Sequence, residues 1–128
     1  MRYLFLFLIL GMVACESGGT YQSGERLYKA SCANCHMDHG EGLGALIPPL
    51  AGSDFLAANR DNLPCIIRKG LMDTIVVNGK VYSEMMPPNP GLSDIQITNI
   101  LNYINSSWGN TQPAYPLEGV RELLKKCE

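Results

Sequence analysis

The feature that most constrains this chain is a pair of cysteines three positions apart, followed at once by a histidine. Cys32 and Cys35 stand in the run Cys-Ala-Asn-Cys-His, which His36 completes. This C-x-x-C-H spacing is the pattern by which two thiols are joined to the two vinyl groups of a haem. On a helical turn the two thiols project toward one side, with His36 beneath the iron. The motif therefore predicts one covalently bound haem c with thioether bonds at Cys32 and Cys35 and with His36 as the proximal iron ligand.

Two other interpretations of the motif are a redox dithiol and a partial zinc site. A thioredoxin-like dithiol is expected within a βαβ pattern, and this sequence has no such pattern around its cysteines. A tetrahedral zinc site needs four ligands, whereas the chain has one further histidine, His39, and its remaining cysteines are distant in sequence. The haem interpretation is favoured over both, and His39 is expected to be an exposed turn residue.

Residues 1–15 have the pattern of an export signal. They read MRYLFLFLILGMVAC, with one arginine, an apolar run and small residues before Cys15. The run is too short to cross a hydrocarbon core of about 30 Å with comfort, so a signal peptide over residues 1–14 is favoured over a retained transmembrane anchor. The ending before Cys15 resembles the lipobox of bacterial lipoproteins, which implies lipidation of Cys15. Residues 15–23 contain Gly and Ser and are expected to form a flexible tether.

Composition limits what the rest of the chain can be. Of its 128 residues, 46% are apolar and 17% are charged, which suits a single domain with one core. The formal net charge is −2, and a chain without an excess of Lys and Arg is poorly suited to nucleic acid. The apolar content also argues against a disordered chain. We therefore expect one folded domain with no nucleic-acid partner.

Local signals predict a mainly α-helical fold with one small hairpin. Capping residues or a first-turn proline mark the expected helix starts, with Ser23 and Ser93 as N-caps, and Gly70 marks a helix end. Asn78-Gly79 between two β-branched runs predicts a type I′ turn. On these signals we expect helices near residues 23–33, 53–60, 64–69, 93–107 and 117–124, with strands at 75–77 and 80–82.

A haem iron bound by one histidine still needs its second axial ligand. His39 lies too close to His36 to reach the opposite face of the macrocycle. Met72, Met85 and Met86 are the methionines outside the N-terminal segment and away from His36. Met85 and Met86 lie in the run SEMMPPNPG, whose prolines exclude a helix interior or a central strand and predict an extended loop. A methionine of this loop is the expected distal ligand, and the residues alone leave the choice open.

From about Gly24 to Asn110 the sequence resembles the small monohaem class I cytochromes c of bacterial cell envelopes. Three motifs in order carry the resemblance, namely Gly24-x-x-x-Tyr28 before C-x-x-C-H, Pro48-Pro49-Leu50, and Met86-Pro87-Pro88. The resemblance implies a class I cytochrome c fold over residues 24–110, in which several helices surround one haem.

The resemblance also implies roles for single residues. Met86 would be the distal iron ligand, with Met85 as the alternative, and the carbonyl of Pro48 would accept a hydrogen bond from the ring of His36. The first and last helices of the fold cross closely, so Gly24 would let Tyr103 approach its backbone. Trp108 would either cover an edge of the haem or serve only as a packing residue.

Cys65 and Cys127 remain after the other cysteines are assigned. An oxidising compartment permits disulfides and disfavours free thiols. The tail at residues 111–128 contains an amphipathic stretch that could pack back on the domain and carry Cys127 to Cys65. We therefore predict a disulfide between these two residues.

A haem with both axial positions filled by protein has no position for a substrate. The sequence therefore predicts a one-electron carrier, not an enzyme, between membrane respiratory components, with redox partners such as a terminal oxidase or reductase and no small-molecule substrate. Alternatives are a haem-containing subunit of a larger complex, or a gas- or peroxide-reactive protein in which Met86 is displaced. Export and lipidation at Cys15 would place the chain on the periplasmic side of the envelope, held at the membrane.

Overall fold

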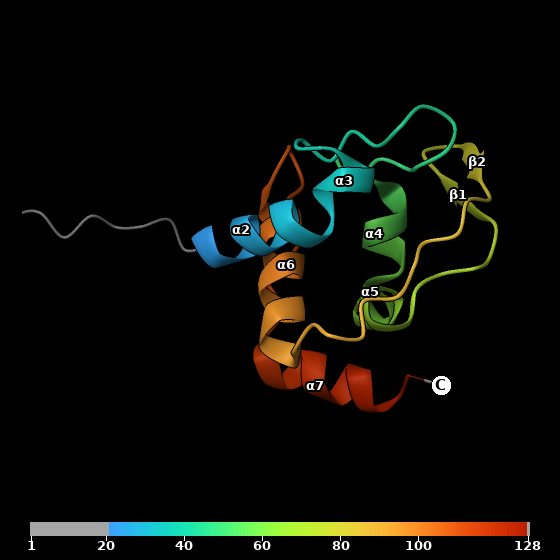
Figure 1. The fold of residues 1–128 in the computed structure, drawn as a ribbon. Helices are drawn as coiled ribbons and strands as arrows, with labels where there is room; N and C mark the ends of the chain where they lie inside the picture. Colours follow the sequence, from blue (N-terminus) through green and yellow to red (C-terminus); the bar gives the residue numbers. More distant parts are fainter. Residues whose placement is uncertain (1–20, 128) are drawn as a thin grey trace, which may run out of the picture.

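A computed structural model describes residues 21–127 of the chain. The signal peptide, Cys15 and most of the expected tether lie outside these residues. The described part is mainly helical with one two-stranded antiparallel sheet, which confirms the predicted fold class (Figure 1). In chain order the elements are α2 (Gln22–Ser31), α3 (Ala33–His36), α4 (Asp54–Ala58), the 3-10 helix η1 (Arg60–Asn62), α5 (Leu63–Lys69), β1 (Ile75–Val77), β2 (Lys80–Tyr82), α6 (Asp94–Ser106) and α7 (Leu117–Lys125).

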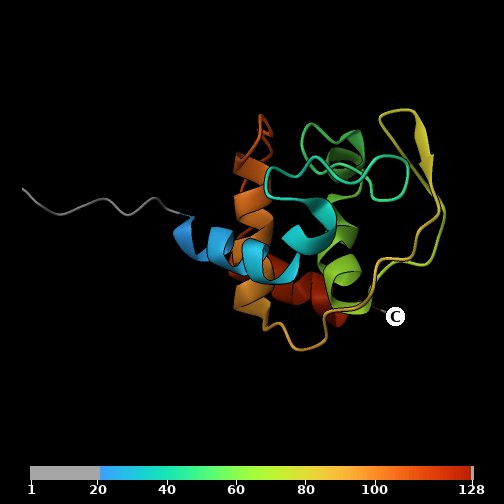
Figure 2. The same cartoon turned by 45° about the horizontal axis from the view of Figure 1, so that its top comes forward.

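Helices α2 and α6 cross at Gly24 (Figure 2). A Cβ at this position would lie 2.2 Å from the carbonyl oxygen of Asn99 and 2.7 Å from Cβ of Tyr103. Only glycine lets the two backbones come this close, so the expected approach of Tyr103 is confirmed. Tyr28, fully buried, packs against Tyr103 with ring centroids 5.5 Å apart. This crossing joins the first described helix to α6.

Helix α2 differs from the prediction at both ends. Ser23 is not the N-cap, because the helix already begins at Gln22 and its N-cap, Tyr21, makes no side-chain capping bond. The hydroxyl of Ser23 instead accepts a hydrogen bond of 3.5 Å from Nδ2 of Asn99. At the other end the helix stops at Ser31, and α3 follows Cys32 as a separate turn. Packing on α6 thus extends the helix into the last residues of the expected tether.

Other helix boundaries follow the sequence signals. Ser53 accepts a hydrogen bond from the backbone N–H of Leu56 at the start of α4. Ser93 and Gln96 form the expected capping box of α6. Helix α5 has a proline in its first turn and ends at Gly70, whose φ is 81°.

The hairpin is held on the start of α4. Ile75 pairs with Tyr82, and the turn has φ of 50° at Asn78 and 76° at Gly79, as a type I′ turn requires. The backbone N–H of Asn78 donates to Oδ1 of Asp54 at 2.7 Å, and the N–H of Asp54 donates to Oδ1 of Asn78 at 3.1 Å. This reciprocal pair fixes where the hairpin lies.

The strand pairing resumes beyond the hairpin at an isolated bridge. Leu71 and Met86 exchange two backbone hydrogen bonds of 3.0 and 2.9 Å. The chain segments on either side of the hairpin part below it and meet again at this bridge (Figure 1). We call residues 71–86 the ribbon. The bridge fixes the backbone of Met86 relative to the end of α5.

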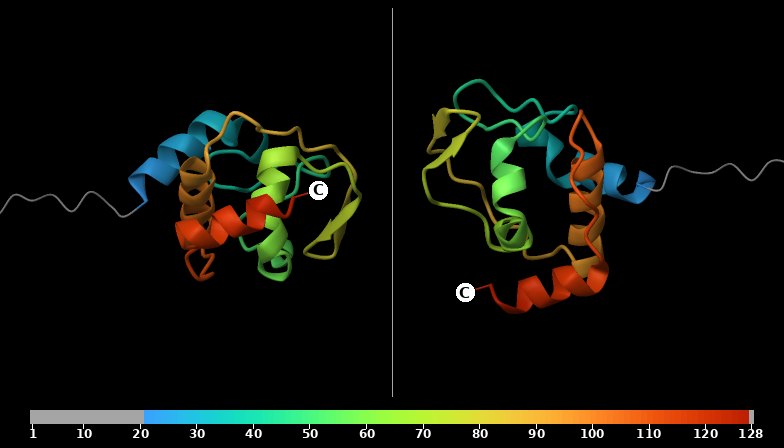
Figure 3. Two further views of the ribbon diagram at one scale, coloured as in Figure 1. Left: turned by 90° about the horizontal axis from the view of Figure 1, so that it is seen from below. Right: turned by 180° about the vertical axis from the view of Figure 1, so that it is seen from behind.

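The C-terminal tail belongs to the core. Val120 of α7 is fully buried and Tyr115 nearly so, and both lie in the cluster of buried apolar side chains. Helix α7 runs across α5 and α6 (Figure 3, left). A disulfide joins Cys65 to Cys127, the pairing that the sequence predicts, with a Cα–Cα distance of 5.5 Å. None of the helices within residues 21–127 has the length and apolar character needed to span a bilayer.

Candidate functional site

A largely apolar pocket lies beside the C-x-x-C-H motif. It encloses about 990 Å³ when the part open to solvent is included. Its walls come from α3, α4, α5 and α6, from the ribbon and from the loop at residues 40–51, which we call the proline loop. The lining residues are Cys32, Cys35, His36, Ile47, Pro48, Pro49, Leu50, Ser53, Phe55, Leu56, Leu63, Ile66, Ile67, Leu71, Asp73, Ile75, Val77, Tyr82, Glu84, Met85, Met86, Pro87, Leu101 and Ile104. Apolar walls of this extent suit a large, flat, apolar cofactor.

His36 is oriented by the proline loop. Its Nδ1 lies 3.1 Å from the carbonyl oxygen of Pro48. Because a carbonyl can only accept, Nδ1 carries the proton and Nε2 keeps its lone pair for a metal. Burial lowers the pKa of His36, against an opposing effect of the hydrogen bond to Pro48. The imidazole is thereby kept in the neutral form that binds iron.

Cys32 and Cys35 both line the pocket and are not joined to each other. Burial, with a smaller contribution from Cys35, raises the pKa of the Cys32 thiol to about 11. A catalytic redox dithiol needs a lowered thiol pKa, so the dithiol interpretation has no support here. Within residues 21–127 no three His, Cys, Asp or Glu side chains gather as a metal site would need. Two thiols at this spacing are the groups that form the thioether bonds of a haem c.

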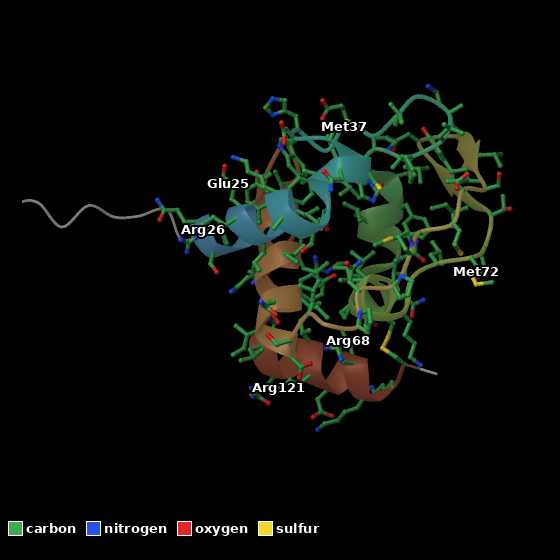
Figure 4. The ribbon with its side chains drawn as sticks, in the orientation of Figure 1. Glu25, Arg26, Met37, Arg68, Met72 and Arg121 are labelled. Carbon is green, nitrogen blue, oxygen red and sulfur yellow. A yellow bond between two sulfur atoms is a disulfide. The ribbon has the colours of Figure 1, made fainter. Side chains whose placement is uncertain are left out.

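The structure separates the three candidate methionines. Met86 lines the pocket, is half-buried and packs against the core, and its backbone is held by the bridge to Leu71. Met85 also reaches the pocket but is 55% exposed. Met72 is 81% exposed and points away from the body of the protein (Figure 4). His36 and Met86 therefore meet at the same pocket from elements far apart in sequence.

Trp108, for which the sequence left haem cover and packing open, lies in an aromatic cluster outside the pocket lining. It is not among the described residues that line the pocket. Its ring packs on Tyr28 and Tyr103, with centroids 5.0 and 5.4 Å apart, and it lies so close to Gly40 that a Cβ there would be 2.6 Å from the indole. The side chain of Trp108 is thus part of the aromatic cluster at the crossing of α2 and α6, where it serves as a packing residue. His39 is exposed, as expected.

Several polar pocket residues were missed from the sequence. Tyr82, 4% exposed, and Ser53, 8% exposed, line the pocket with hydroxyl groups, and the exposed Asp73 and Glu84 lie at its mouth. In the ribbon, residues 71, 73, 75 and 77 and residues 82, 84 and 86 all face the pocket, as the alternation of a strand requires. The predicted Asn78-Gly79 turn sets this register, so the alternation could have identified Tyr82.

Comparisons with known proteins agree with this geometry. The family model described as Cytochrome C oxidase, cbb3-type, subunit III matches residues 19–104. A cytochrome c-552 of Thermus thermophilus is 35% identical over 134 aligned residues, which cover 98% of this chain and 87% of that protein. The cytochrome c subunit of alcohol dehydrogenase (quinone) from Gluconobacter oxydans is 29% identical over 77% of this chain, which corresponds to 21% of that longer protein.

Proposed function

The chain belongs to the cytochrome c family, and from that premise we propose that it carries single electrons on one covalently bound haem c ligated by His36 and Met86. The observation that carries the proposal is the set of groups at one pocket. A neutral imidazole oriented by Pro48 lies there with two unpaired thiols and a half-buried thioether. These are the groups that attach a haem c and fill both axial positions of its iron.

Each residue has a separate part in the proposal. Cys32 and Cys35 hold the cofactor covalently, and His36 binds the iron while Pro48 fixes the ring. Met86 supplies a thioether, which raises the reduction potential. The apolar walls provide a largely apolar environment for the cofactor, and an iron with both axial positions filled by protein has no position for a substrate. A bound haem supplies the one-electron oxidation and reduction, and the chain supplies attachment, ligands and a dry environment.

A second candidate function is that of an electron-transferring subunit within a larger oxidoreductase. Relatives named as cytochrome c subunits support it, among them that of gluconate 2-dehydrogenase from Pantoea cypripedii, 32% identical over 73% of this chain. In either role the partner is a redox protein, such as a dehydrogenase, a terminal oxidase or a reductase. Export to the periplasmic side and a lipid anchor at Cys15 would keep the chain near such partners.

Optical spectra of the holoprotein test the proposed ligation. We expect the oxidised protein to show the weak long-wavelength absorption band of a methionine-ligated ferric haem, and the reduced protein to remain unchanged under carbon monoxide. Both follow from an iron whose axial positions are filled. A high-spin haem that binds carbon monoxide would contradict the carrier and favour the gas- or peroxide-reactive alternative.

Substitution of the two adjacent methionines identifies the distal ligand. Met86→Ala is expected to abolish the methionine band, open the iron to carbon monoxide and lower the reduction potential by the order of 0.2 V, within the range of about 0.8 V that axial ligands span. Met85→Ala is the matched control, because Met85 is 55% exposed. This variant should keep the methionine absorption band and the reduction potential of the wild type. The reverse result would assign the ligand to Met85. Spectroscopy and potentiometric titration of both holoproteins provide the measurement.

A further inference from the structure

We propose that Asn110 is a positioning residue for the proximal iron ligand. The two hydrogen bonds that its side-chain amide donates hold the proline loop where the carbonyl of Pro48 meets the ring of His36. This inference rests on the proposed ligation of the haem iron by His36. It gives a role to a residue that is not among the described residues lining the pocket.

The orientation of His36 depends on the proline loop. The carbonyl oxygen of Pro48 lies 3.1 Å from Nδ1 of His36, and the two residues are 12 positions apart in sequence. A hydrogen bond of this kind fixes the rotation of the imidazole ring and makes it a stronger metal ligand. The contact lasts only while the loop keeps its place beside α3. A residue that holds the loop therefore acts on the ligand.

The base of the proline loop is closed by backbone hydrogen bonds. The N–H groups of Leu50 and Ala51 both donate to the carbonyl oxygen of Gly40, at 2.7 and 2.9 Å. The N–H of Gly42 donates to the carbonyl oxygen of His36 at 3.1 Å, at the end of α3. Helix α3 is a single turn of 4 residues, so the loop needs a further support to be fixed against the core.

Asn110 supplies this support by joining the loop base to α6. Its Nδ2 donates to the carbonyl oxygen of Leu50 at 3.0 Å and to that of Ile104 at 2.9 Å. Its Oδ1 accepts a hydrogen bond of 2.9 Å from the N–H of Gly52. The turn after α6 and the loop base lie side by side (Figures 1 and 3). Among residues 21–127 no other side chain hydrogen-bonds to both the proline loop and α6.

The turn that carries Asn110 has an uncommon backbone conformation. Trp108 and Gly109 both have a positive φ, 54° and 84°, and the N–H of Asn110 donates to the carbonyl oxygen of Ser107 at 2.9 Å. A left-handed backbone is unfavourable for a residue as bulky as tryptophan, so contacts elsewhere maintain it. The indole lies against Gly40, where a Cβ would be 2.6 Å away, and the amide of Asn110 provides the other contact. Both are made to the base of the proline loop.

Hydrogen exchange at His36 tests the proposal on the reduced holoprotein. Nitrogen–proton NMR follows the exchange of the Nδ1 proton with solvent, which requires the bond to Pro48 to open. Asn110→Ala removes both donated bonds, and we expect exchange to become about tenfold faster. The reduction potential should rise, because a weaker bond at Nδ1 makes the imidazole a poorer donor to iron. Asn110→Asp keeps the size and the Oδ1 acceptor without the donors, so it should cause the same two changes.

Asn102→Ala is the matched control. Nδ2 of Asn102 donates to the carbonyl oxygen of Tyr115 at 3.1 Å, and Oδ1 accepts from the N–H of Tyr115 at 2.7 Å. This asparagine, half-buried like Asn110, thus ties the C-terminal tail to α6 and makes no contact with the loop. A general loss of stability would affect both alanine variants. We expect Asn102→Ala to keep the wild-type potential and an exchange rate within about twofold of the wild type.

The outcomes separate this inference from the proposed function. Equal exchange in the wild type and Asn110→Ala, or in Asn110→Ala and Asn102→Ala, would overturn the positioning role. Wild-type exchange in Asn110→Asp would overturn it as well, because the donated bonds would then not be needed. The proposed ligation is checked in the same spectra, since a histidine on a haem iron has ring protons strongly shifted by the macrocycle. If the wild type lacks these shifts, the ligation fails, and the positioning role fails with it.

Discussion

Replacement of both Cys65 and Cys127 by serine is expected to lower the free energy of unfolding of the holoprotein by about 4 kcal/mol, the chain-entropy value for a loop of this length. The disulfide spans 62 residues of sequence and ties the end of α7 to α5. In the unfolded chain it removes the conformations in which the two ends are apart, and this restriction is its main contribution. Urea unfolding, followed by the helical circular-dichroism signal, measures the change as a lower midpoint.

A matched control separates the disulfide from the polar contacts beside it. Nζ of Lys69 donates to the carbonyl oxygen of Cys127 at 2.9 Å, at an exposed position. Lys69→Ala removes this contact and keeps the disulfide, so we expect a change below about 0.5 kcal/mol. An unchanged midpoint in the double serine variant would show that the packing of α7, and not the covalent bond, holds the tail on the core.

Gly70→Ala is expected to destabilise the protein by about 3 kcal/mol, from backbone strain and overpacking together, and to disturb the distal ligand. Gly70 has φ of 81° and ψ of −176°, a conformation that residues with a Cβ avoid. A Cβ there would also lie 2.5 Å from the carbonyl oxygen of Met86 and 2.9 Å from the nitrogen of Pro88. Because the segment at Met86 must shift to relieve this contact, we expect the methionine absorption band to weaken as well.

Gly79→Ala is the control for Gly70→Ala. Gly79 also has a positive φ, 76°, but nothing lies within 4 Å of the position that its Cβ would take. We therefore expect a loss of about 1 kcal/mol from backbone strain alone and an unchanged spectrum. Equal losses in the two variants, with the band intact in both, would show that Gly70 does not support the position of Met86.

Local chemistry explains which parts of the fold could be predicted from the sequence. The Asn78-Gly79 turn and the capping box at Ser93 and Gln96 depend on neighbouring residues only, and the structure has both as predicted. The start of α2 and the position of Trp108 depend on contacts between α2 and α6. No local pattern encodes those contacts, so the expected cap at Ser23 was wrong, and the sequence left open the two roles of Trp108, of which the structure shows the packing one.

The residues of the candidate site likewise divide into those that local chemistry predicts and those that depend on tertiary contacts. The thiols and His36 could be predicted because the covalent chemistry itself demands their spacing. The choice of Met86 over Met85 needed the resemblance to a family, since both residues belong to one loop. Tyr82 was missed because burial of the hairpin against the pocket is a tertiary fact, even though the turn already sets which residues face inward.

The pocket walls come from residues 32 to 104, and this spread orders events during synthesis. A chain is made from its N-terminus, so the two attachment thiols and His36 are available well before Met86, and α6 follows later still. Helix α2 packs mainly on α6, which is made later, so attachment of the haem can precede compaction. Cys65 meanwhile waits for a thiol made 62 residues later. Early capture of Cys32 and Cys35 by the haem would leave Cys65 and Cys127 as the only pair free to oxidise among residues 21–127, and so would prevent mispairing among these four.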